Sequence, residues 1–233
     1  MTLIVTTLRP NEVLITADSR SITREAGQVV ALRDDQQKIF PIPQRPLAIL
    51  HHGENRFENR PVTDWLNEIT QDARFAASSV EQATDLLRQL AYPIVRARLK
   101  SLLDSLAGCG LCVVGFDNLA AQNSNRNPRM TELFWSFSAG IFRCEERRFS
   151  GVCVIPSGDG QTQIEPVSWK QIHQQPLPAV QQYQQRLFDQ AASAVPPDAG
   201  VPNSVGGPLQ QLLISPNGWE WTLPPASAMQ QLL

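Results

Sequence analysis

The segment Thr2-Leu-Ile-Val-Thr-Thr-Leu-Arg-Pro-Asn-Glu-Val-Leu-Ile-Thr-Ala-Asp-Ser-Arg20 decides the fold. Its two runs of aliphatic and β-branched residues, 3–8 and 13–17, have the composition of β-strands. Pro10 and Asn11 lie between the two runs, and both residue types are common in tight turns. The segment therefore predicts a β-hairpin.

A hairpin centred near Pro10 would pair residues whose numbers sum to about twenty. This register predicts that Thr2 lies directly opposite Asp18. Because side chains alternate along a strand, it also predicts an apolar face and a more polar face. The apolar face would comprise Leu3, Val5, Val13, Ile15 and Ala17, and the other face Thr2, Ile4, Thr6, Thr16 and Asp18.

The rest of the chain shows strand-like and helix-like patterns in turn. Strands are predicted at 38–42, 47–50, 111–116, 132–138, 151–155, 209–214 and 219–223, and helices at 62–103, with a break near 76–79, and at 179–194. Strand groups that enclose helix groups imply two sheets packed face to face with helices outside. The predicted class is α+β, a four-layer αββα sandwich of two antiparallel sheets flanked by helices.

Composition limits the classes of partner. With 233 residues and 42% hydrophobic content, the chain is expected to form one domain over residues 1–233. A formal net charge of -2 predicts no nucleic-acid partner and no anionic membrane surface. No run approaches the ~20 apolar residues of a membrane span, and the start of the sequence lacks signal-peptide features. A cytoplasmic location is therefore expected.

The four cysteines raise the question of a zinc or thiol site, because Cys109 and Cys112 have Cys-x-x-Cys spacing. Cys112 and Cys153, however, lie within apolar runs that indicate buried strands. Packing in the core is therefore the favoured interpretation, and no metal or cofactor is predicted. His51 and His52 have no accompanying nucleophile motif and are interpreted as walls of a substrate pocket.

This sequence contains, in order, Thr2, Ala17-Asp18-Ser19-Arg20, Lys38, a strand that ends at Gly53, the turn after Ser157 and Ser204-Val-Gly-Gly. The order and spacing of these motifs resemble those of the proteasome β-subunit family and its bacterial relatives. The family's mature chain begins with a threonine, and an Ala-Asp-Ser-Arg element places its aspartate sixteen residues later. Thr2 and Ala17-Asp18-Ser19-Arg20 resemble this arrangement. Lys38 before an apolar strand, and the strand that ends at Gly53, match the next two elements in order. The glycine-rich turn after Ser157 and the Ser204-Val-Gly-Gly element resemble the family's two later motifs.

The resemblance implies an N-terminal-nucleophile hydrolase that cleaves amide bonds. Its expected catalytic residues are Thr2, Asp18, Lys38, Gly53, Ser157 and Ser204. A threonine hydroxyl needs a base within hydrogen-bond reach, and removal of Met1 would give Thr2 a free α-amine with a pKa of about 7.7 to 8.0. Lys38 would lower the proton affinity of Thr2, Asp18 would hold the lysine charged, and the Gly53 N–H would stabilise the oxyanion.

The sequence departs from this pattern in three places. Lys38 lies about four residues further from Asp18 than is usual, which requires an enlarged loop at 24–37. Pro156 stands where a glycine normally precedes the serine, and no aspartate directly precedes Ser204. These departures affect the supporting serines more than Thr2, Asp18 and Lys38.

The resemblance also implies partners. Self-association into a ring is expected, with a peptide or an unfolded protein as substrate and an unfoldase as a further partner. The paired Trp219 and Trp221 and the apolar stripes of the first two helices are expected to pack against other subunits. Two alternatives remain: a catalytically silent structural subunit, and an amidase of the same class that acts on a small molecule.

Overall fold

The computed structural model describes residues 2–25, 28–57, 60–102, 108–117, 127–164, 172, 174–194 and 203–226. Its first half contains β1 (Ile4–Arg9), β2 (Glu12–Ala17), β3 (Ser21–Glu25), β4 (Gln28–Arg33), β5 (Ile39–Pro41), β6 (Leu47–Gly53), β7 (Arg56–Phe57), β8 (Arg60–Pro61), α1 (Val62–Ile69), the short 3-10 helix η1 (Ala73–Ala77) and α2 (Val80–Ser101). Its second half contains β9 (Gly108–Gly115), β10 (Arg129–Ser138), β11 (Ile141–Ser150), β12 (Cys153–Ser157), the 3-10 helix η2 (Asp159–Gln163), α3 (Leu177–Ser193), β13 (Gln210–Ser215) and β14 (Gly218–Leu223).

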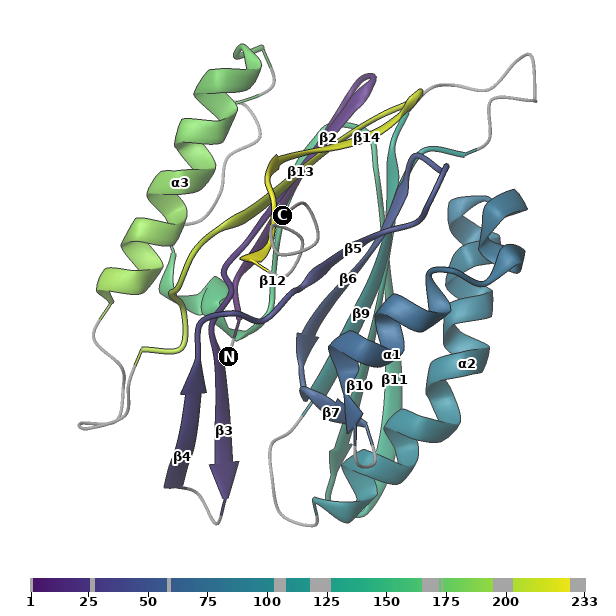
Figure 1. The fold of residues 1–233 in the computed structure, drawn as a ribbon, viewed down its shortest axis with the longest axis vertical. Coiled ribbons are helices and arrows are strands. Elements are labelled where there is room, and N and C mark those ends of the chain that lie inside the picture. Colours follow the sequence, from purple (N-terminus) through teal and green to yellow (C-terminus); the bar gives the residue numbers. More distant parts are fainter. Residues whose placement is uncertain are drawn as a thin grey trace.

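Two five-stranded antiparallel sheets form the centre of the molecule (Figure 1). The first sheet has the strand order β12-β1-β2-β13-β14, and the second has the order β11-β10-β9-β6-β5. In Figure 1, α3 lies beside the first sheet, and α1 and α2 lie beside the second. The predicted α+β class and the two antiparallel sheets are confirmed.

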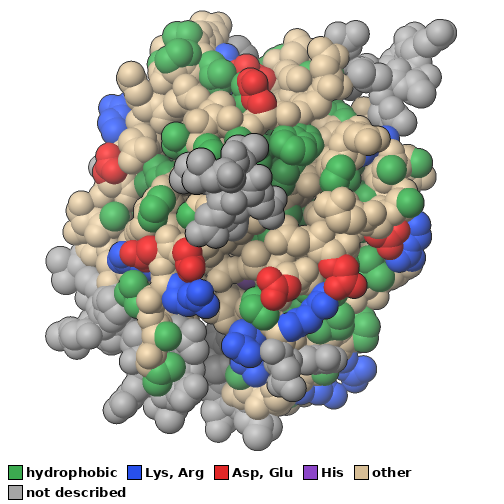
Figure 2. Space-filling model, in the orientation of Figure 1, with side chains coloured by type: hydrophobic (Ala, Val, Ile, Leu, Met, Phe, Trp, Pro, Cys, Tyr) green, Lys and Arg blue, Asp and Glu red, His purple; other side chains and the backbone are tan. Residues whose placement is uncertain are grey.

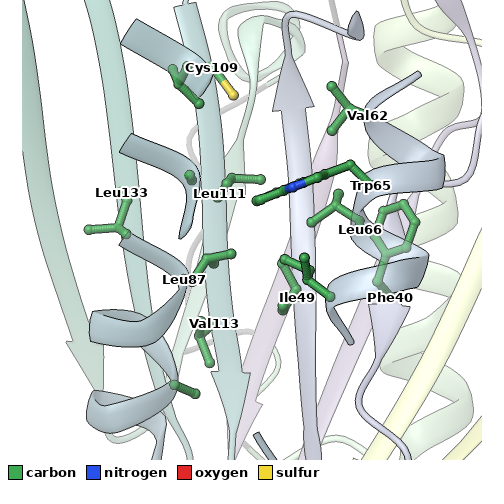
Figure 3. Close-up of a cluster of buried hydrophobic side chains, with 14 of the residues drawn as sticks. Phe40, Ile49, Val62, Trp65, Leu66, Leu87, Cys109, Leu111, Val113 and Leu133 are labelled. Atoms are coloured by element: carbon green, nitrogen blue, oxygen red, sulfur yellow. The ribbon is translucent and has the colours of Figure 1, made fainter. Parts of the chain in front are cut away.

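Apolar side chains fill the space between the sheets and the space under the helices. The cluster between the sheets joins Ile4, Ile15 and Ile214 of the first sheet to Leu50 and Val114 of the second. A separate cluster packs α1 and α2 against the opposite face of the second sheet, with Trp65 and Leu66 directed toward Leu111 and Ile49 (Figure 3). The inner strands of each sheet, such as β1 and β2 in the first and β6 and β9 in the second, therefore bury both of their faces.

The hairpin of β1 and β2 has a register that differs by one residue from the prediction. Ile4 pairs with Ala17 and Arg9 pairs with Glu12, which leaves a two-residue turn with Asn11 at φ 64°. The paired numbers therefore sum to 21, since Ile4 and Ala17 are partners. A one-residue shift moves side chains to the opposite face of the sheet.

Two parts of the hairpin prediction are consequently wrong. Leu3 and Val5 face α3, where they pack with Leu187 and Phe188, and they do not share a face with Ile15. The residue beside Asp18 is Leu3, whose carbonyl oxygen accepts a hydrogen bond from the Asp18 N–H at 3.3 Å. Thr2 lies one residue before this position. By alternation with Ile4, its side chain belongs to the layer between the sheets.

The helical region begins where the sequence predicts, and its predicted break is present. Ser79 caps α2, because its hydroxyl accepts a hydrogen bond from the Gln82 N–H and the Gln82 side chain accepts one from the Ser79 N–H. The interruption between α1 and α2 covers residues 70–79, which is longer than the predicted break at 76–79, and it contains the short helix η1. Within the described residues, no helix is both long enough and apolar enough to cross a membrane.

Three strand pairs of the described residues were not predicted from the sequence, and the shortest of them is β7 with β8. The enlarged loop expected at 24–37 contains most of a hairpin, β3 and β4, which extends from the body of the molecule (Figure 1). Strand β11 was also missed. It pairs with β10 through a turn with Ala139 at φ 50° and Gly140 at φ 77°, and it lies at the edge of the second sheet. Most β11 side chains are exposed, so the strand lacks the apolar alternation that marks a half-buried strand.

Hydrogen bonds from one buried glutamine side chain, Gln184, join α3 to the first sheet. The Gln184 side chain is fully buried; its amide donates to the Thr7 hydroxyl at 2.8 Å, and its carbonyl oxygen accepts from the Thr16 hydroxyl. The amide also donates to the carbonyl oxygen of Val5 at 3.3 Å. The carbonyl oxygen of Leu14 lies 3.4 Å from the same amide nitrogen. Loss of the Gln184 side chain would therefore remove a partner or a contact from four groups on β1 and β2.

We predict that Gln184→Leu lowers the free energy of unfolding by about 1–3 kcal/mol, because buried Thr7 and Thr16 would lose a hydrogen-bond partner. Urea denaturation measures the change. Gln185→Leu is the matched control on the same helix, because the Gln185 side chain bonds to Asp189 at an exposed position. The control should change stability by less than about 0.5 kcal/mol. Equal effects in the two variants would contradict the assigned role of Gln184.

Candidate active site

Asp18 lies at the centre of the candidate site. It follows β2, is fully buried, and its carboxylate accepts hydrogen bonds from four groups. Oδ1 accepts from the Leu3 N–H at 3.0 Å and from Lys38 Nζ at 2.8 Å. Oδ2 accepts from the N–H groups of Arg20 at 3.3 Å and Gly206 at 3.2 Å. One carboxylate therefore joins the beginning of the chain, the residue before β5 and the 203–208 turn.

Lys38 is the buried cation that pairs with Asp18. Its Nζ donates to Asp18 and also to the carbonyl oxygen of Arg20 at 2.7 Å. Burial lowers the pKa of Lys38 below its ordinary value, although Asp18 acts to raise it. The Lys38 carbonyl oxygen accepts from the His51 N–H at 3.0 Å, which anchors the lysine to the second sheet. The pair thus bridges the two sheets.

Thr2 is held next to the turn that follows β12. Its carbonyl oxygen accepts a hydrogen bond from the Gly160 N–H at 3.0 Å. A Cβ on Gly158 would lie 2.3 Å from the same carbonyl oxygen, and Gly158 has a φ of 86°. Only glycine, which has no side chain, therefore allows this turn to lie so close to Thr2. Among the described residues, no hydrogen bond joins the Thr2 hydroxyl to Lys38.

Ser157 and Ser204 flank this region from two different segments. Ser157 ends β12 and pairs with Ile4, two residues after Thr2. Ser204 lies in the turn whose Gly206 N–H donates to Asp18. Both side chains are buried, and neither hydroxyl has a hydrogen-bond partner in the described part of the chain. Buried hydroxyls usually have partners, so these two are available for a further group.

Gly53 is less closely associated with the other candidates. It ends β6 with a φ of 91°, and a Cβ there would lie 2.2 Å from the Gly108 carbonyl oxygen. It lies two residues after His51, which bonds to Lys38, so it belongs to the same end of the second sheet. The structure thus brings Asp18 and Lys38 into direct contact, places Thr2, Ser157 and Ser204 around them, and leaves Gly53 without a described contact to Thr2.

The two histidines differ in environment. Burial lowers the pKa of His51 to about 3, and its Nε2 lies 2.8 Å from the Glu54 carbonyl oxygen. His52 lies on the other face of β6, where its Nε2 is 3.1 Å from Glu132 Oε1. Both side chains are buried, and their role as walls of a substrate pocket stays a prediction.

The two cysteines of the Cys-x-x-Cys sequence face opposite ways. Cys109 belongs to the cluster under the helices (Figure 3), whereas Cys112 belongs to the cluster between the sheets. Residues three apart on a strand must point to opposite faces, so these cysteines cannot share a ligand. Burial, together with Glu132, raises the pKa of the Cys112 thiol well above its ordinary value, and the Ser157 hydroxyl acts in the opposite direction.

Sequence reasoning missed Glu132 as a member of this region. Burial acts to raise its pKa, but the hydrogen bond and charge of His52, the charge of Arg147 and the Ser157 hydroxyl outweigh burial and lower it. The residue lies in a run predicted correctly as a strand, and a glutamate inside an apolar strand was the available signal.

Two of the solved structures that are similar to this chain are Anbu proteins. No protein-family model and no curated protein matches the sequence. Anbu (ancestral beta-subunit) from Yersinia bercovieri matches with a TM-score of 0.57 and 14% identity, over 99% of this chain and 90% of that chain. Anbu from Hyphomicrobium sp. strain MC1 matches with a TM-score of 0.54 and 14% identity, over 99% of this chain and 96% of that chain.

These matches correct the family assignment made from the sequence. The assignment to the proteasome β-subunit family is wrong: the structural neighbours are Anbu proteins, a proteasome-related but distinct family, and no family model matches. The motifs that suggested the assignment lie at strand ends and turns, where a shared fold requires similar residues in more than one family. At 14% identity, the likeness establishes the fold alone.

Proposed function

We propose that this protein is an N-terminal-nucleophile hydrolase that cleaves amide bonds, with Thr2 as nucleophile after removal of Met1. The observation that carries the proposal is the buried pair of Asp18 and Lys38 beside the start of β1. A buried ion pair is costly to maintain, and strongly perturbed groups of this kind are common at functional sites. The fold shared with an ancestral beta-subunit protein is consistent with this chemistry.

In the proposed mechanism, the free α-amine of Thr2 takes the proton of its own hydroxyl, and the hydroxyl oxygen attacks the substrate carbonyl carbon to give an oxyanion. As the oxyanion collapses, the C–N bond breaks and the α-ammonium gives its proton to the leaving amine. Water then hydrolyses the ester on Thr2, which restores the hydroxyl and releases the acid. Lys38 favours the deprotonated nucleophile by its positive charge, and Asp18 holds the lysine in place. The Gly53 N–H is assigned to the developing oxyanion. The hydroxyls of Ser157 and Ser204, which have no partner among the described residues, are assigned to the α-amine and to a water molecule near it.

The same proposal extends to architecture. We assign the arrangement of helices outside two packed sheets to the four-layer αββα sandwich of N-terminal-nucleophile hydrolases, formed by a single domain of residues 1–233. Self-association into a ring that admits peptides or unfolded chains is part of the proposal, with an unfoldase as a further partner. Figure 2 shows acidic and basic side chains intermingled on the face in view, without a large area of one sign.

We predict that Thr2→Ala reduces hydrolysis of short fluorogenic peptide amides to below about a hundredth of the wild-type rate, because loss of a nucleophile costs several powers of ten. Thr2→Ser should retain measurable activity. Thr6→Ala is the matched control: Thr6 lies on β1, four residues after Thr2, and its buried hydroxyl has no partner among the described residues. Its activity should stay within about threefold of the wild type.

Intact-mass measurement of the same preparations separates the alternatives. The active protein should begin at Thr2, because an acylated α-amine cannot act as a base. Active material that retains Met1 would overturn the mechanism. A uniformly trimmed protein without peptidase activity would favour the small-molecule amidase, and an inactive, untrimmed protein that assembles would favour a silent structural subunit.

A further prediction concerns the buried ion pair of Lys38 and Asp18. Lys38→Met should lower the free energy of unfolding by about 3–5 kcal/mol, because it leaves Asp18 charged and buried without its partner. Hydrolysis per folded molecule should also fall at least about a hundredfold. Arg33→Met removes one member of an exposed pair with Asp35 and should cost less than about 1 kcal/mol. Unchanged activity in folded Lys38→Met protein would exclude the lysine from the mechanism.

The residues expected to drive assembly require a correction. Trp219 and Trp221 share a face as predicted, but they pack against the cluster between the sheets. The apolar stripes of α1 and α2 are buried against the second sheet. We instead assign self-association to the β3–β4 hairpin, where Val30 and Leu32 are 52% and 41% exposed. Alternation along β4 places both on one side.

We predict that the purified protein sediments as a homo-oligomer at micromolar concentration, because the hairpin offers an apolar edge to a second copy. The double variant Val30→Lys, Leu32→Glu should shift the population toward the 25.9 kDa monomer. Leu223→Glu, at a residue 43% exposed on β14, is the control and should leave the distribution unchanged. A wild-type protein that sediments as a single 25.9 kDa species would refute assembly.

A further inference from the structure

Three side chains with different donor atoms, none of which belongs to the Asp18–Lys38 pair, meet between the sheets. His52 of β6, Cys112 of β9 and Glu132 of β10 lie on three strands that are direct neighbours in the second sheet. Cys112 and Glu132 are cross-strand partners, and His52 extends the same face from β6. All three side chains are buried.

The donor atoms are close enough to surround one ion. His52 Nε2 lies 3.1 Å from Glu132 Oε1, and Cys112 Sγ lies 3.9 Å from the same oxygen. The three donor atoms all lie within 4.8 Å of one another. Tetrahedral zinc, with bonds of about 2.0–2.3 Å, separates its ligand atoms by roughly 3.3–3.7 Å. Small rotations of these side chains would therefore produce a coordination shell.

The surroundings of the cluster leave room for these side chains and direct them inward. A Cβ on Gly110 would lie 2.0 Å from His52 Nε2, so the imidazole occupies space that only glycine leaves open. The outer oxygen of Glu132, Oε2, lies 3.8 Å from Arg147 Nη1, which leaves Oε1 directed at His52 and Cys112. The cluster thus has one oxygen, one nitrogen and one sulfur donor on the same side.

A fourth group faces the cluster from the first sheet. Ser157 is 2% exposed, and its hydroxyl has no hydrogen-bond partner within the described ranges. Hydrogen bonding by this hydroxyl nevertheless acts to lower the pKa of both Cys112 and Glu132, so the hydroxyl lies beside both groups. The hydroxyl thus lies beside two of the three donors without a hydrogen bond of ordinary geometry to either, and it can reach an ion bound between them or a water molecule on that ion.

We propose that His52, Cys112 and Glu132 bind one zinc ion, with the fourth position directed at the Ser157 hydroxyl. Thiolate and imidazole donors favour zinc over magnesium and calcium, which prefer oxygen. The thiolate and the carboxylate together balance the charge of the divalent ion. The site is buried on every side that the structure describes, which matches a structural role in holding the second sheet against β12.

The test begins with the full-length wild-type protein, treated with chelator and then titrated with Zn²⁺ and, separately, with Co²⁺. We expect about one bound ion per chain after dialysis, measured by mass spectrometry of the metal. The Co²⁺ form should show thiolate-to-cobalt charge-transfer absorption with the intensity of a tetrahedral site. Zinc should also raise the melting temperature of the chelator-treated protein.

Matched variants assign the ligands. Cys112→Ser and Glu132→Gln should each weaken zinc binding by at least about tenfold. In metal sites generally, removal of a residue that only hydrogen-bonds to a ligand already costs this much. Cys109→Ser is the control, since it alters the other buried cysteine of the same strand on the opposite face. It should keep the full zinc content and the charge-transfer band. Glu132→Gln preserves the shape of the side chain, so it tests the site even where Cys112→Ser folds poorly.

A wild-type protein that retains no zinc, or a cobalt form without thiolate absorption, would overturn the proposal. So would equal losses in Cys109→Ser and Cys112→Ser. Metal content and absorption are measured without peptide hydrolysis, and the proposed zinc ion is not a reactant in the Thr2 mechanism, with which its site shares only Ser157. The zinc proposal and the hydrolase proposal can therefore fail separately, and each experiment identifies which one has failed.

Discussion

A fully buried carboxylate, Asp18, is the constraint on which the rest of the site depends. An ionised carboxylate in the interior is stable only when opposite charge and hydrogen-bond donors surround it. Lys38 supplies the charge, and three backbone N–H groups supply the remaining bonds. Each donor comes from a different part of the chain, so satisfying one side chain fixes the start of β1, the residue before β5 and the 203–208 turn relative to one another.

The hairpin shows how much of this arrangement a sequence can predict. The composition of residues 2–20 identifies both strands and the turn, and it brings the start of the chain close to Asp18. The number of residues in the turn sets the pairing register of the two strands. Composition identifies the turn but does not determine whether it has two or three residues. Pro10 and Asn11 form a two-residue turn, so Leu3 lies beside Asp18. The prediction of which β1 side chains face the space between the sheets was therefore wrong, although the prediction of a strand was right.

Other errors arise from the same limit on local patterns. Strand β11 is an edge strand with charged side chains on both faces, and hydrogen bonding to β10 creates it without apolar alternation. The Cys-x-x-Cys spacing suggested a joint ligand pair, but a strand directs its two sulfurs apart. His52, Cys112 and Glu132 are distant in sequence and meet only because β6, β9 and β10 are neighbours. Such a cluster needs the strand order, which local patterns do not contain.

Ser157 connects the proposed zinc site to the proposed nucleophile. Its hydroxyl faces Cys112 and Glu132, whereas the turn that it begins contains Gly158 and Gly160, which hold the Thr2 carbonyl oxygen. From the sequence, Ser157 was expected to act only in catalysis, because the pattern around it is that of a glycine-rich turn. Its position on β12 gives it a second environment between the sheets. An ion held there would restrict the last residue of β12, and through it the turn that positions the first residue of the catalytic hairpin.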